Sequence, residues 1–223
     1  MSWIIGVDVG GTFTDFCARN NNSGETVIHK RPSTPEDPAI AILNGLDEIK
    51  LKFSKSKKLQ ISRLAHGTTV ATNSLLQRKG GKLALVTTNG FRDLLEIGRQ
   101  VRPSVYDLQV DSPQPLVDRR NRIEVNERID FTGNIIKPIN KNELALLEKN
   151  IKKLKNIDGI AICLLFAFLN SSHEILIKEK LSKSFPNLPI SISSEVQPEF
   201  REYERFSTTT INAYLQPEVG MYM

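Results

Sequence analysis

Residues 4–16 constrain the fold most, because a short apolar strand, two glycines and a second apolar run follow one another there. The first strand carries one carboxylate, Asp8, and ends at a Gly-Gly pair that is followed by two threonines. We expect a β-hairpin with a tip of glycine and threonine. Glycine lets backbone N–H groups come close to a phosphate because no Cβ intrudes, and threonine hydroxyls add donors. The pattern therefore predicts a phosphate-binding loop made of Gly10, Gly11, Thr12 and Thr14.

Asp8 has an expected role of its own. At the end of its strand it is placed to hold Mg²⁺, directly or through water, and is the candidate catalytic and metal-linked carboxylate. The alternative is a plain tight hairpin with a structural aspartate, because Gly-Gly between apolar runs is a common turn. A buried aspartate in such a strand needs a partner, since an unpaired buried charge is costly. The aspartate, the glycines and the Thr-x-Thr-Asp run together favour the phosphate loop. It is not a Walker A loop, because no Gly-Lys-Ser/Thr follows.

Composition narrows the function classes. Hydrophobic residues make up 39% and charged residues 25%, which is typical of a globular chain. The net charge of +5 is a mild surplus without an aromatic-interleaved basic stripe, so we expect no nucleic-acid binding. No apolar run has the length of a membrane span and no signal peptide precedes Trp3, so we expect no membrane association and a cytoplasmic location. Cys17 and Cys163 lie in apolar runs and are expected to be small core residues. The three histidines are far apart, which argues against a zinc site.

Hydrophobic periodicity predicts the order β-β-β-α-β-α-β-α over residues 1–100. Three antiparallel strands are followed by a helix with a cap at Thr34 or Asp37 and an apolar face of Ile42, Leu46, Ile49 and Phe53. A strand is expected to end at His66, and a helix to run from Thr68 to the Gly80-Gly81 stop. This order is similar to the ribonuclease-H-like fold of the actin, hexokinase and Hsp70 ATPase superfamily, whose first phosphate loop the 4–16 hairpin resembles.

Residues 101–138 break the periodicity and predict a loop-rich connection with one hairpin. Residues 139–223 then return to an α/β pattern that ends in a helix. Asn140 with Glu143 and Ser171 with Glu174 have the spacing of capping boxes. The nearly all-apolar run 157–168 predicts a strand covered on both sides.

Several stretches together resemble the N-terminal region of the hydantoinase A and 5-oxoprolinase family. They are the loop at residues 6–15, His66-Gly67-Thr68-Thr69-Val70-Ala71-Thr72-Asn73, Gly90-Phe91-Arg92-Asp93, Ile97-Gly98-Arg99-Gln100, and Ser193-Ser194-Glu195-Val196 with Arg201-Glu202-Tyr203-Glu204-Arg205. The resemblance implies a ribonuclease-H-like half with a mixed sheet, and a hydrolase that opens cyclic amides with ATP and Mg²⁺. It implies that a carbonyl oxygen is phosphorylated before the ring opens. Related subunits belong to acetone and acetophenone carboxylases.

His66, Gly67, Thr68 and Thr69 are the second candidate site. Backbone N–H groups at a helix start, together with two hydroxyls, can bind an oxyanion or phosphate. The alternative is a threonine N-cap beside a satisfied histidine, and the resemblance favours a role toward the substrate or the transferring phosphoryl group. Arginines near loops, Arg92, Arg99 and Arg102, with Asp93 beside them, are more often surface ion pairs than phosphate clamps. The alternating charges of residues 201–205 predict a salt-bridged helix face rather than a catalytic one.

No second Asp-x-Gly-Gly-Thr pattern occurs, whereas the superfamily carries a second phosphate loop and an adenosine pocket in its other half. We therefore expect a truncated chain, the product of a split gene or a degraded relative, which lacks a C-terminal lobe or a hydantoinase B-like partner subunit. The main hypothesis is the N-terminal region of an ATP-dependent cyclic amidohydrolase, inactive by itself. The alternatives are the ATP-using subunit of a ketone carboxylase and a non-catalytic partner-binding fragment. Hydantoin, 5-oxoproline and ketone substrates all stay open.

Overall fold

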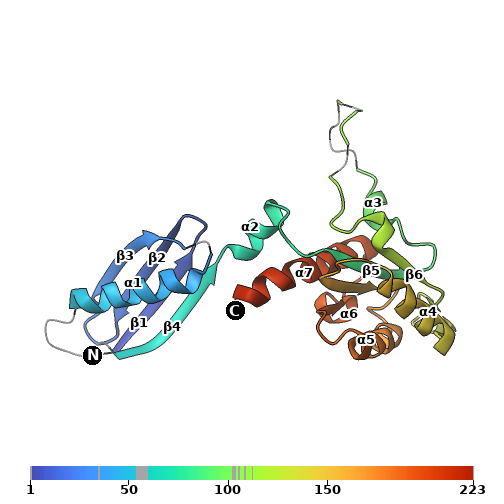
Figure 1. Ribbon diagram of the computed structural model, residues 1–223. Coiled ribbons are helices and arrows are strands. Elements are labelled where there is room, and N and C mark those ends of the chain that lie inside the picture. The colour runs from blue at the N-terminus through green and yellow to red at the C-terminus, as the bar shows by residue number, and fades with distance from the viewer. Residues whose placement is uncertain are drawn as a thin grey trace. The chain divides into compact units, whose positions relative to one another are not determined.

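The chain folds into two units, each built around its own main sheet. Figure 1 shows the computed structural model, which describes residues 2–34, 36–53, 60–101, 104, 106–107, 109–111 and 113–222. Unit 1 comprises Met1–Lys79 together with Glu218–Met223, and unit 2 comprises Gly80–Pro217. The chain therefore leaves unit 1, forms unit 2, and then rejoins unit 1.

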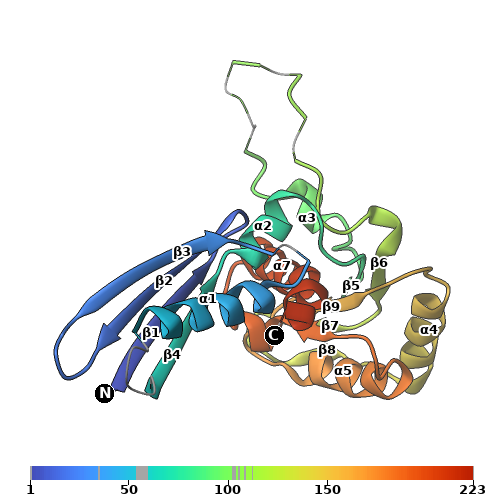
Figure 2. The same ribbon diagram turned by 60° about the vertical axis from the view of Figure 1, so that its left-hand side comes forward.

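Unit 1 contains a four-stranded mixed sheet with the order β3-β2-β1-β4. β1, β2 and β3 pair antiparallel, whereas β4 runs parallel to β1. Helix α1 lies along one face of this sheet (Figures 1 and 2). The bounds are β1 Ser2–Val9, β2 Phe13–Asn20, β3 Thr26–Pro32, α1 Pro38–Phe53, β4 Gln60–Thr68 and α2 Val70–Leu76. The predicted α/β class and the mixed sheet of a ribonuclease-H-like half are confirmed.

The core of unit 1 follows from the two-residue period of a strand. Every second side chain of β1 is buried on the α1 face: Trp3, Ile5, Val7 and Val9. α1 contributes Leu46 and Ile49 to the same cluster, and Ile42 packs against it, as its predicted apolar face requires. The side chain of Phe53 lies outside the described residues. Of the two candidate caps, Asp37 stands directly before the helix and accepts the N–H of Ala39, while Thr34 adds a longer-range bond by accepting the N–H of Ala41.

The opposite face of the sheet is open to solvent over β1, β2 and β3. Cys17 is exposed there, so its expected place in the core is wrong. The reason is strand alternation: Cys17 follows the buried Phe16, so it points away from α1. Ile28 on β3 is 77% exposed on the same face. Apolar runs predicted these strands correctly, but they do not show which face a helix covers.

Unit 2 contains a parallel sheet with the order β10-β9-β5-β6. Its centre is β9, every residue of which is buried, as predicted for a strand covered on both sides. The strands are β5 Leu83–Thr88, β6 Arg122–Val125, β9 Gly159–Cys163 and β10 Ile190–Ile192, with the hairpin β7 Arg128–Ile129 and β8 Ile135–Lys137 beside them. The helices are α3 Leu94–Ile97, η1 Arg119–Asn121, α4 Lys141–Lys152, α5 Ser172–Ser184, α6 Ser193–Val196 and α7 Glu202–Tyr222. No helix in the described part of the chain combines the length and apolarity needed to span a membrane.

The division of the chain differs from the predicted one at 1–100, 101–138 and 139–223. β5 was expected in the first sheet, but it pairs with β9 and β6, so the boundary falls after Lys79. α2 ends at Leu76 rather than at the two glycines. Gly80 instead permits close packing, because a Cβ there would overlap the ring of Tyr214.

The two predicted capping boxes have different outcomes. Asn140 caps α4 as predicted, since its side chain accepts the N–H of Glu143 at 2.9 Å. Ser171 makes no side-chain cap bond to α5. Glu174 points inward instead, where it accepts the N–H of Leu164 at 2.9 Å and the hydroxyl of Ser193 at 2.6 Å. Burial raises the pKa of Glu174, against the effect of these donors.

The predicted ion pairs of residues 201–205 are present, because Glu204 pairs with Arg99 and Glu202 pairs with the buried Arg205. Its guanidinium donates to the carbonyl of Leu164 at 2.7 Å and to the hydroxyl of Ser193 at 3.0 Å, and it pairs with Glu202. The buried Cys163 lies on the neighbouring strand β9, and burial raises the pKa of its thiol. The charge pattern of residues 201–205 thus marks a junction of helix and sheet.

A surface cluster joins α4 to α5. Glu148 pairs with Lys152 one turn further along α4, and with Lys180 of α5 at 2.6 Å. Lys152 and then Lys180 lower the pKa of Glu148 to about 2.

Candidate functional site

The hairpin tip between β1 and β2 has the predicted glycine-rich form. The N–H of Gly10 donates to the carbonyl of Phe13 at 3.0 Å and closes the turn. A Cβ on Gly10 would lie 3.0 Å from that same oxygen, so the turn leaves little room for a side chain there. In the described part of the chain the N–H groups of Gly11 and Thr12 have no hydrogen-bond partner, and both residues are exposed. The loop therefore offers two adjacent donors.

Thr14 lies on the buried side of β2. It is fully buried, and its hydroxyl forms a 2.9 Å hydrogen bond with the hydroxyl of Ser33. In this geometry Thr14 supports the loop from inside unit 1, while the hydroxyl of Thr12 stands on the exposed side. Phosphate contacts from Gly10, Gly11, Thr12 and Thr14 remain predictions.

Asp8 is exposed, on the face of the sheet that α1 leaves open, and not buried as expected. Strand alternation again explains the difference, because Asp8 lies between the buried Val7 and Val9. Among the described residues its side chain forms no hydrogen bond or ion pair. Asp15 is its partner across the β1–β2 ladder, and Gly67 of β4 lies beside it. The neighbouring glycine leaves space, since a Cβ at Gly67 would lie 3.7 Å from Asp8 Oδ1.

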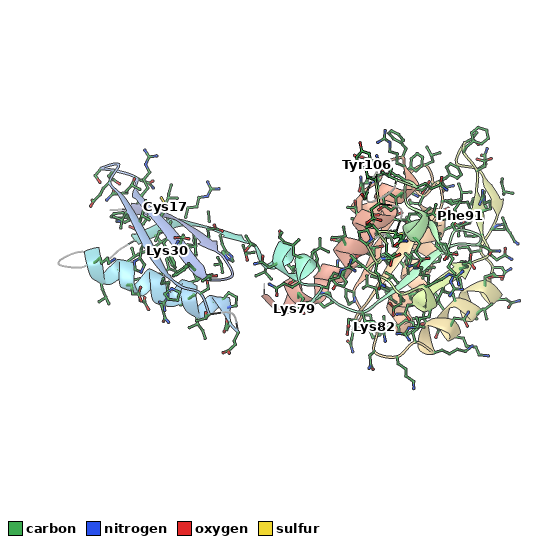
Figure 3. All side chains as sticks on the ribbon, turned by 90° about the horizontal axis from the view of Figure 1, so that it is seen from above. Cys17, Lys30, Lys79, Lys82, Phe91 and Tyr106 are labelled. Carbon is green, nitrogen blue, oxygen red and sulfur yellow. The ribbon has the colours of Figure 1, made fainter. Side chains whose placement is uncertain are left out.

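This carboxylate fits the predicted magnesium role. No group of three metal-ligating side chains gathers within the described residues, so protein ligands alone would not complete a site. Mg²⁺ commonly takes one or two carboxylates and completes its shell with water and phosphate oxygens. Asp8 can supply one carboxylate, because it has no ion-pair partner in the described structure. Asp15 is less available, because Lys30 pairs with it at 3.1 Å; Lys30 is labelled in Figure 3.

The second candidate segment lies along β4 and at its end. β4 continues to Thr68, beyond the predicted end at His66, so His66, Gly67 and Thr68 are strand residues. Only Thr69 lies in the turn before α2, and it makes no side-chain cap bond. α2 begins at Val70, with Thr69 at its N-cap position, and has only seven residues, so anion binding by this segment stays a prediction. The N–H of Thr69 donates to the carbonyl of Val9 at 3.3 Å, which ties this turn to the end of β1.

The structure distributes the predicted residues over two hollows of unit 1. One, of about 270 Å³, is lined by Gly10 and Gly11 of the loop and by Thr69. The other, of about 470 Å³, lies on the open face and is lined by Asp8, His66 and Gly67 among others. Thr12 and Thr68 line neither of the two. The loop and the β4 end therefore meet at the smaller pocket.

Further polar residues with no predicted role also line the smaller pocket, among them Ser33, Asn73, Lys79 and the oppositely charged Glu218. The amide nitrogen of Asn73 donates to the hydroxyl of Thr69 at 3.1 Å, and it would lie 3.4 Å from a Cβ on Gly11. Lys79, labelled in Figure 3, brings a positive charge. Asn73 follows Thr69 by four residues, a spacing that places both on one side of a helical turn, and this signal was available in the sequence.

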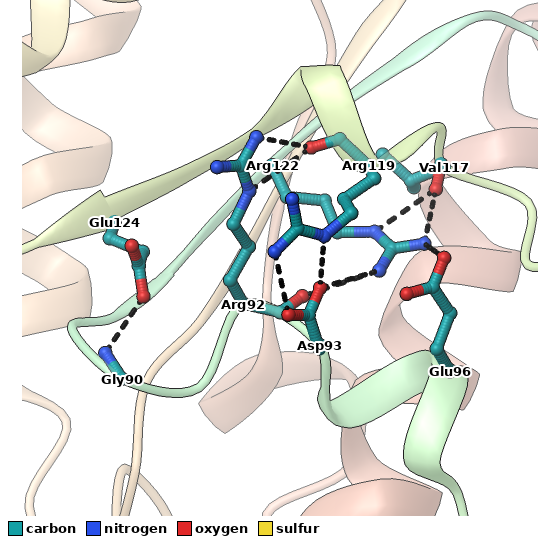
Figure 4. A network of polar contacts seen from close by, with 8 residues as sticks. All are labelled: Gly90, Arg92, Asp93, Glu96, Val117, Arg119, Arg122 and Glu124. Carbon is teal, nitrogen blue, oxygen red and sulfur yellow. Dashed lines mark hydrogen bonds and ion pairs between the residues drawn. The ribbon is translucent and has the colours of Figure 1, made fainter.

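Unit 2 carries an arginine network around the Gly90-Phe91-Arg92-Asp93 segment (Figure 4). Arg119 binds Asp93 through two hydrogen bonds of 2.7 and 2.9 Å, and it lowers the pKa of Asp93. Arg92 donates twice to the carbonyl of Arg119. Arg122 is buried and donates to the carbonyl of Val117. Asp93 is thus ion-paired, as predicted, whereas the hydrogen bonds of the Arg92 side chain go to a backbone carbonyl.

The sequence analysis considered two other arginines near loops, Arg99 and Arg102. Arg99 pairs with Glu204 at the surface. Arg102 lies outside the described residues.

Comparison with known proteins identifies the family. The sequence model described as "Hydantoinase/oxoprolinase N-terminal region" matches residues 4–185. The chain belongs to this family. This match confirms the resemblance and covers the loop, the His66–Asn73 segment and the motifs at residues 90–100, whereas the motifs at residues 193–205 lie beyond the matched range.

Three relatives show which proteins this hydantoinase/oxoprolinase region is similar to. The uncharacterized protein MJ0964 of Methanocaldococcus jannaschii is 42% identical over 100% of this chain and 32% of its own length. Caprolactamase subunit alpha of Pseudomonas jessenii is 33% identical over 98% of this chain and 32% of its own. The crystal structure of the ATP-dependent caprolactamase from that organism matches with a TM-score of 0.87, 31% identity, and coverage of 100% and 32%. The nucleotide-free structure of acetone carboxylase matches with a TM-score of 0.84, 25% identity, and coverage of 95% and 32%. This chain thus spans about a third of the length of these relatives.

Proposed function

We propose that this chain is the N-terminal region of an ATP-dependent cyclic amidohydrolase of the hydantoinase or 5-oxoprolinase type. The observation that carries the proposal is the pocket of about 270 Å³, where Gly10 and Gly11 meet Thr69 and Asn73. Pockets for drug-sized ligands have about 300–1,000 Å³. The pocket therefore suits a phosphate group better than a complete nucleotide. Family membership and the likeness to caprolactamase support the reaction class.

Each residue of the site has a proposed task. The N–H groups of Gly11 and Thr12 donate to phosphate oxygens, as adjacent backbone donors do in anion nests. The hydroxyl of Thr69 faces the transferring phosphoryl group, and His66, Gly67 and Thr68 position the substrate side. Asp8 holds Mg²⁺ directly or through water. When bound, the metal ion neutralises charge that develops on the phosphate oxygens.

The proposed chemistry is phosphorylation of an amide carbonyl oxygen. Amide resonance resists hydrolysis, and transfer of the terminal phosphoryl group of ATP to that oxygen, with ADP as leaving group, makes the carbonyl carbon more electrophilic. Water then attacks this carbon, and the C–N bond breaks as the nitrogen takes a proton, which opens the ring and leaves an acyl phosphate. A second water hydrolyses the acyl phosphate to a carboxylate and inorganic phosphate. Phosphoryl transfer depends mainly on positioning and charge stabilisation from several sides. The described site supplies one loop, one carboxylate and the β4 end. We therefore propose that a further lobe, or a hydantoinase B-like subunit, completes the enzyme, and that the complex works in the cytoplasm.

A second candidate is the ATP-using subunit of a ketone carboxylase. The acetone carboxylase structure favours it, with a TM-score of 0.84. Activating a ketone as its enol phosphate would use the same loop, so geometry alone ranks the two candidates together. We put the amidohydrolase first because the matching family model is that of the hydantoinases and oxoprolinases. Sequence identity does not separate the two candidates, since caprolactamase subunit alpha and the acetophenone carboxylase gamma subunit are each 33% identical to this chain.

The test uses the enzyme that contains this region, with Asp8→Asn and Gly11→Val as variants. ATP-dependent opening of 5-oxoproline, hydantoin and caprolactam is measured beside ATP-dependent carboxylation of acetone. We expect ring opening in the wild type and none in either variant, because one variant loses the metal ligand and the other fills the phosphate space. Asp47→Asn on the exposed side of α1 is the matched control, since Asp47 pairs only with Lys50 in the described structure. Full activity of Asp8→Asn would refute the assignment, and acetone turnover alone would favour the second candidate.

The isolated chain is proposed to bind ATP weakly and not to hydrolyse it. Calorimetric titration with ATP and Mg²⁺ and a phosphate-release assay measure both properties. Tight binding with steady turnover would show that no further lobe is needed.

A further inference from the structure

Ser33, directly after β3, contacts the phosphate loop at three points. Its N–H donates to the carbonyl of Thr12 at 2.9 Å, and its hydroxyl donates to the carbonyl of Gly10 at 2.8 Å. The same hydroxyl lies 2.9 Å from that of Thr14. A hydroxyl has one proton, and Ser33 gives it to Gly10, so Thr14 is the donor in the second bond. One residue from outside the hairpin thus binds both ends of its tip.

The bond to Gly10 has a geometric consequence for Gly11. A peptide group is planar and trans, so the carbonyl of Gly10 and the N–H of Gly11 belong to one plane and point in opposite directions. Fixing the carbonyl on the Ser33 hydroxyl therefore also fixes the direction of the Gly11 N–H. Within the loop only the bond from Gly10 to Phe13 closes the turn, and glycines allow many backbone angles. Without Ser33 the Gly10–Gly11 peptide would be free to rotate.

We propose that Ser33 is a positioning residue that holds the Gly11 N–H in the direction needed to bind a nucleotide phosphate. This role rests on the proposed function, because it assumes that the loop binds phosphate. Ser33 acts through the peptide groups of the loop, with Thr14 as the buried donor that orients its hydroxyl. The role also gives the buried hydroxyl of Thr14 a function that needs no direct phosphate contact.

Ser62 provides a matched control at the other end of β1. Its hydroxyl donates to the carbonyl of Trp3 at 3.1 Å and accepts from the side chain of Asn21 at 3.2 Å. It therefore makes the same kind of bond pair as Ser33, but at the opposite end of the strand from the loop. Ser62→Ala should change stability in a similar way without changing the loop.

The experiment uses the full 223-residue chain and its Ser33→Ala, Ser33→Thr and Ser62→Ala variants. Backbone ¹⁵N relaxation of Gly11 and Thr12 reports loop order without any ligand. Titration with MgATP, followed by the amide shifts of the same residues, reports affinity even when binding is weak. Two lost hydrogen bonds of about 1 kcal/mol each correspond to an affinity loss of up to roughly thirtyfold. We expect Ser33→Ala to lose about that much and to loosen Gly11, Ser33→Thr to restore both, and Ser62→Ala to alter neither.

The possible results separate this inference from the proposed function. If Ser33→Ala leaves Gly11 as ordered as in the wild type, the positioning role is refuted. The role is equally refuted if the loop loosens while affinity for MgATP stays unchanged. If the wild type shows no shift at Gly11 or Thr12 at any MgATP concentration, the proposed nucleotide site itself fails, and this role fails with it.

Discussion

Replacing Arg205 by methionine should destabilise unit 2 strongly and leave unit 1 unchanged. The guanidinium is fully buried and donates to Ser193, to the carbonyls of Leu164 and Glu199, and to Glu202. Methionine keeps an apolar stem of similar length but leaves these acceptors without their donor. Removing one partner of a buried ion pair costs about 3–5 kcal/mol. Domains of this size lose about 2–5 °C in Tm per kcal/mol, so we expect a shift of roughly 10–20 °C.

The single tryptophan makes the assay specific to each unit. Trp3 is buried in unit 1, so its fluorescence follows the unfolding of that unit, while far-UV circular dichroism follows both. Arg205→Met should shift the circular dichroism transition of unit 2 and leave the fluorescence transition in place. Arg201→Met is the control, because Arg201 is exposed and lies over the ring of Phe200. A change below about 1 kcal/mol for Arg205→Met, or an equal change for the control, would refute the energetic role given to the buried guanidinium.

Three other predictions follow from contacts described above. The pKa of Glu148 is lowered to about 2, so its ion pairs stabilise the fold fully above its ordinary pKa of 4.5, and this stabilisation is lost as the pH falls from 4.5 toward 2. Glu148→Gln should therefore flatten the dependence of unfolding free energy on pH in this window, measured by urea unfolding at several pH values. An unchanged slope would contradict the prediction. Gly45→Ala should lower the midpoint of thermal unfolding of unit 1, followed by Trp3 fluorescence, because the new methyl overlaps the buried ring of Phe16. Overpacking costs about 1–3 kcal/mol, which is more than alanine gains over glycine in helix propensity. A raised midpoint would show that the ring moves freely. Thr68→Val with Thr69→Val should lower kcat of the complete enzyme while its ATP affinity holds, and lost affinity with normal turnover at saturation would refute the substrate-side role.

The elements that the sequence predicted well depend on residues close together in the chain. The Asn140 cap, the apolar face of α1 and the hairpin of β1 and β2 each need only local spacing. The place of β5 depends on β9, which lies far along the chain, so its apolar run showed a strand without showing its sheet. Glu174 had the spacing of a capping box, but donors on Leu164 and Ser193 compete for its carboxylate, and only tertiary structure reveals them.

The candidate site was predictable to a similar extent. The glycine tip and the carboxylate of Asp8 were visible, because the loop is one continuous stretch of sequence. The exposure of Asp8 was not, since an alternating strand has two faces and the sequence does not show which one α1 covers. The contacts of Ser33 with the loop were hidden too, because they form only once β3 has paired with β2 and brought Ser33 beside Thr12.

The interruption of unit 1 has a consequence for synthesis on the ribosome. The segment Glu218–Met223 belongs to unit 1 but is translated only after all of unit 2, Gly80–Pro217, has emerged. At about 5–20 residues per second this takes roughly 7–28 seconds, ample time for a small α/β unit to fold. β4 is an edge strand of the unit 1 sheet, and an unpaired strand edge is a surface that other extended chains can pair with. Once unit 2 has folded, its compact form shortens the effective loop that unit 1 must close. A substitution that slows folding in unit 2 should therefore also delay unit 1, even though it lies outside that unit.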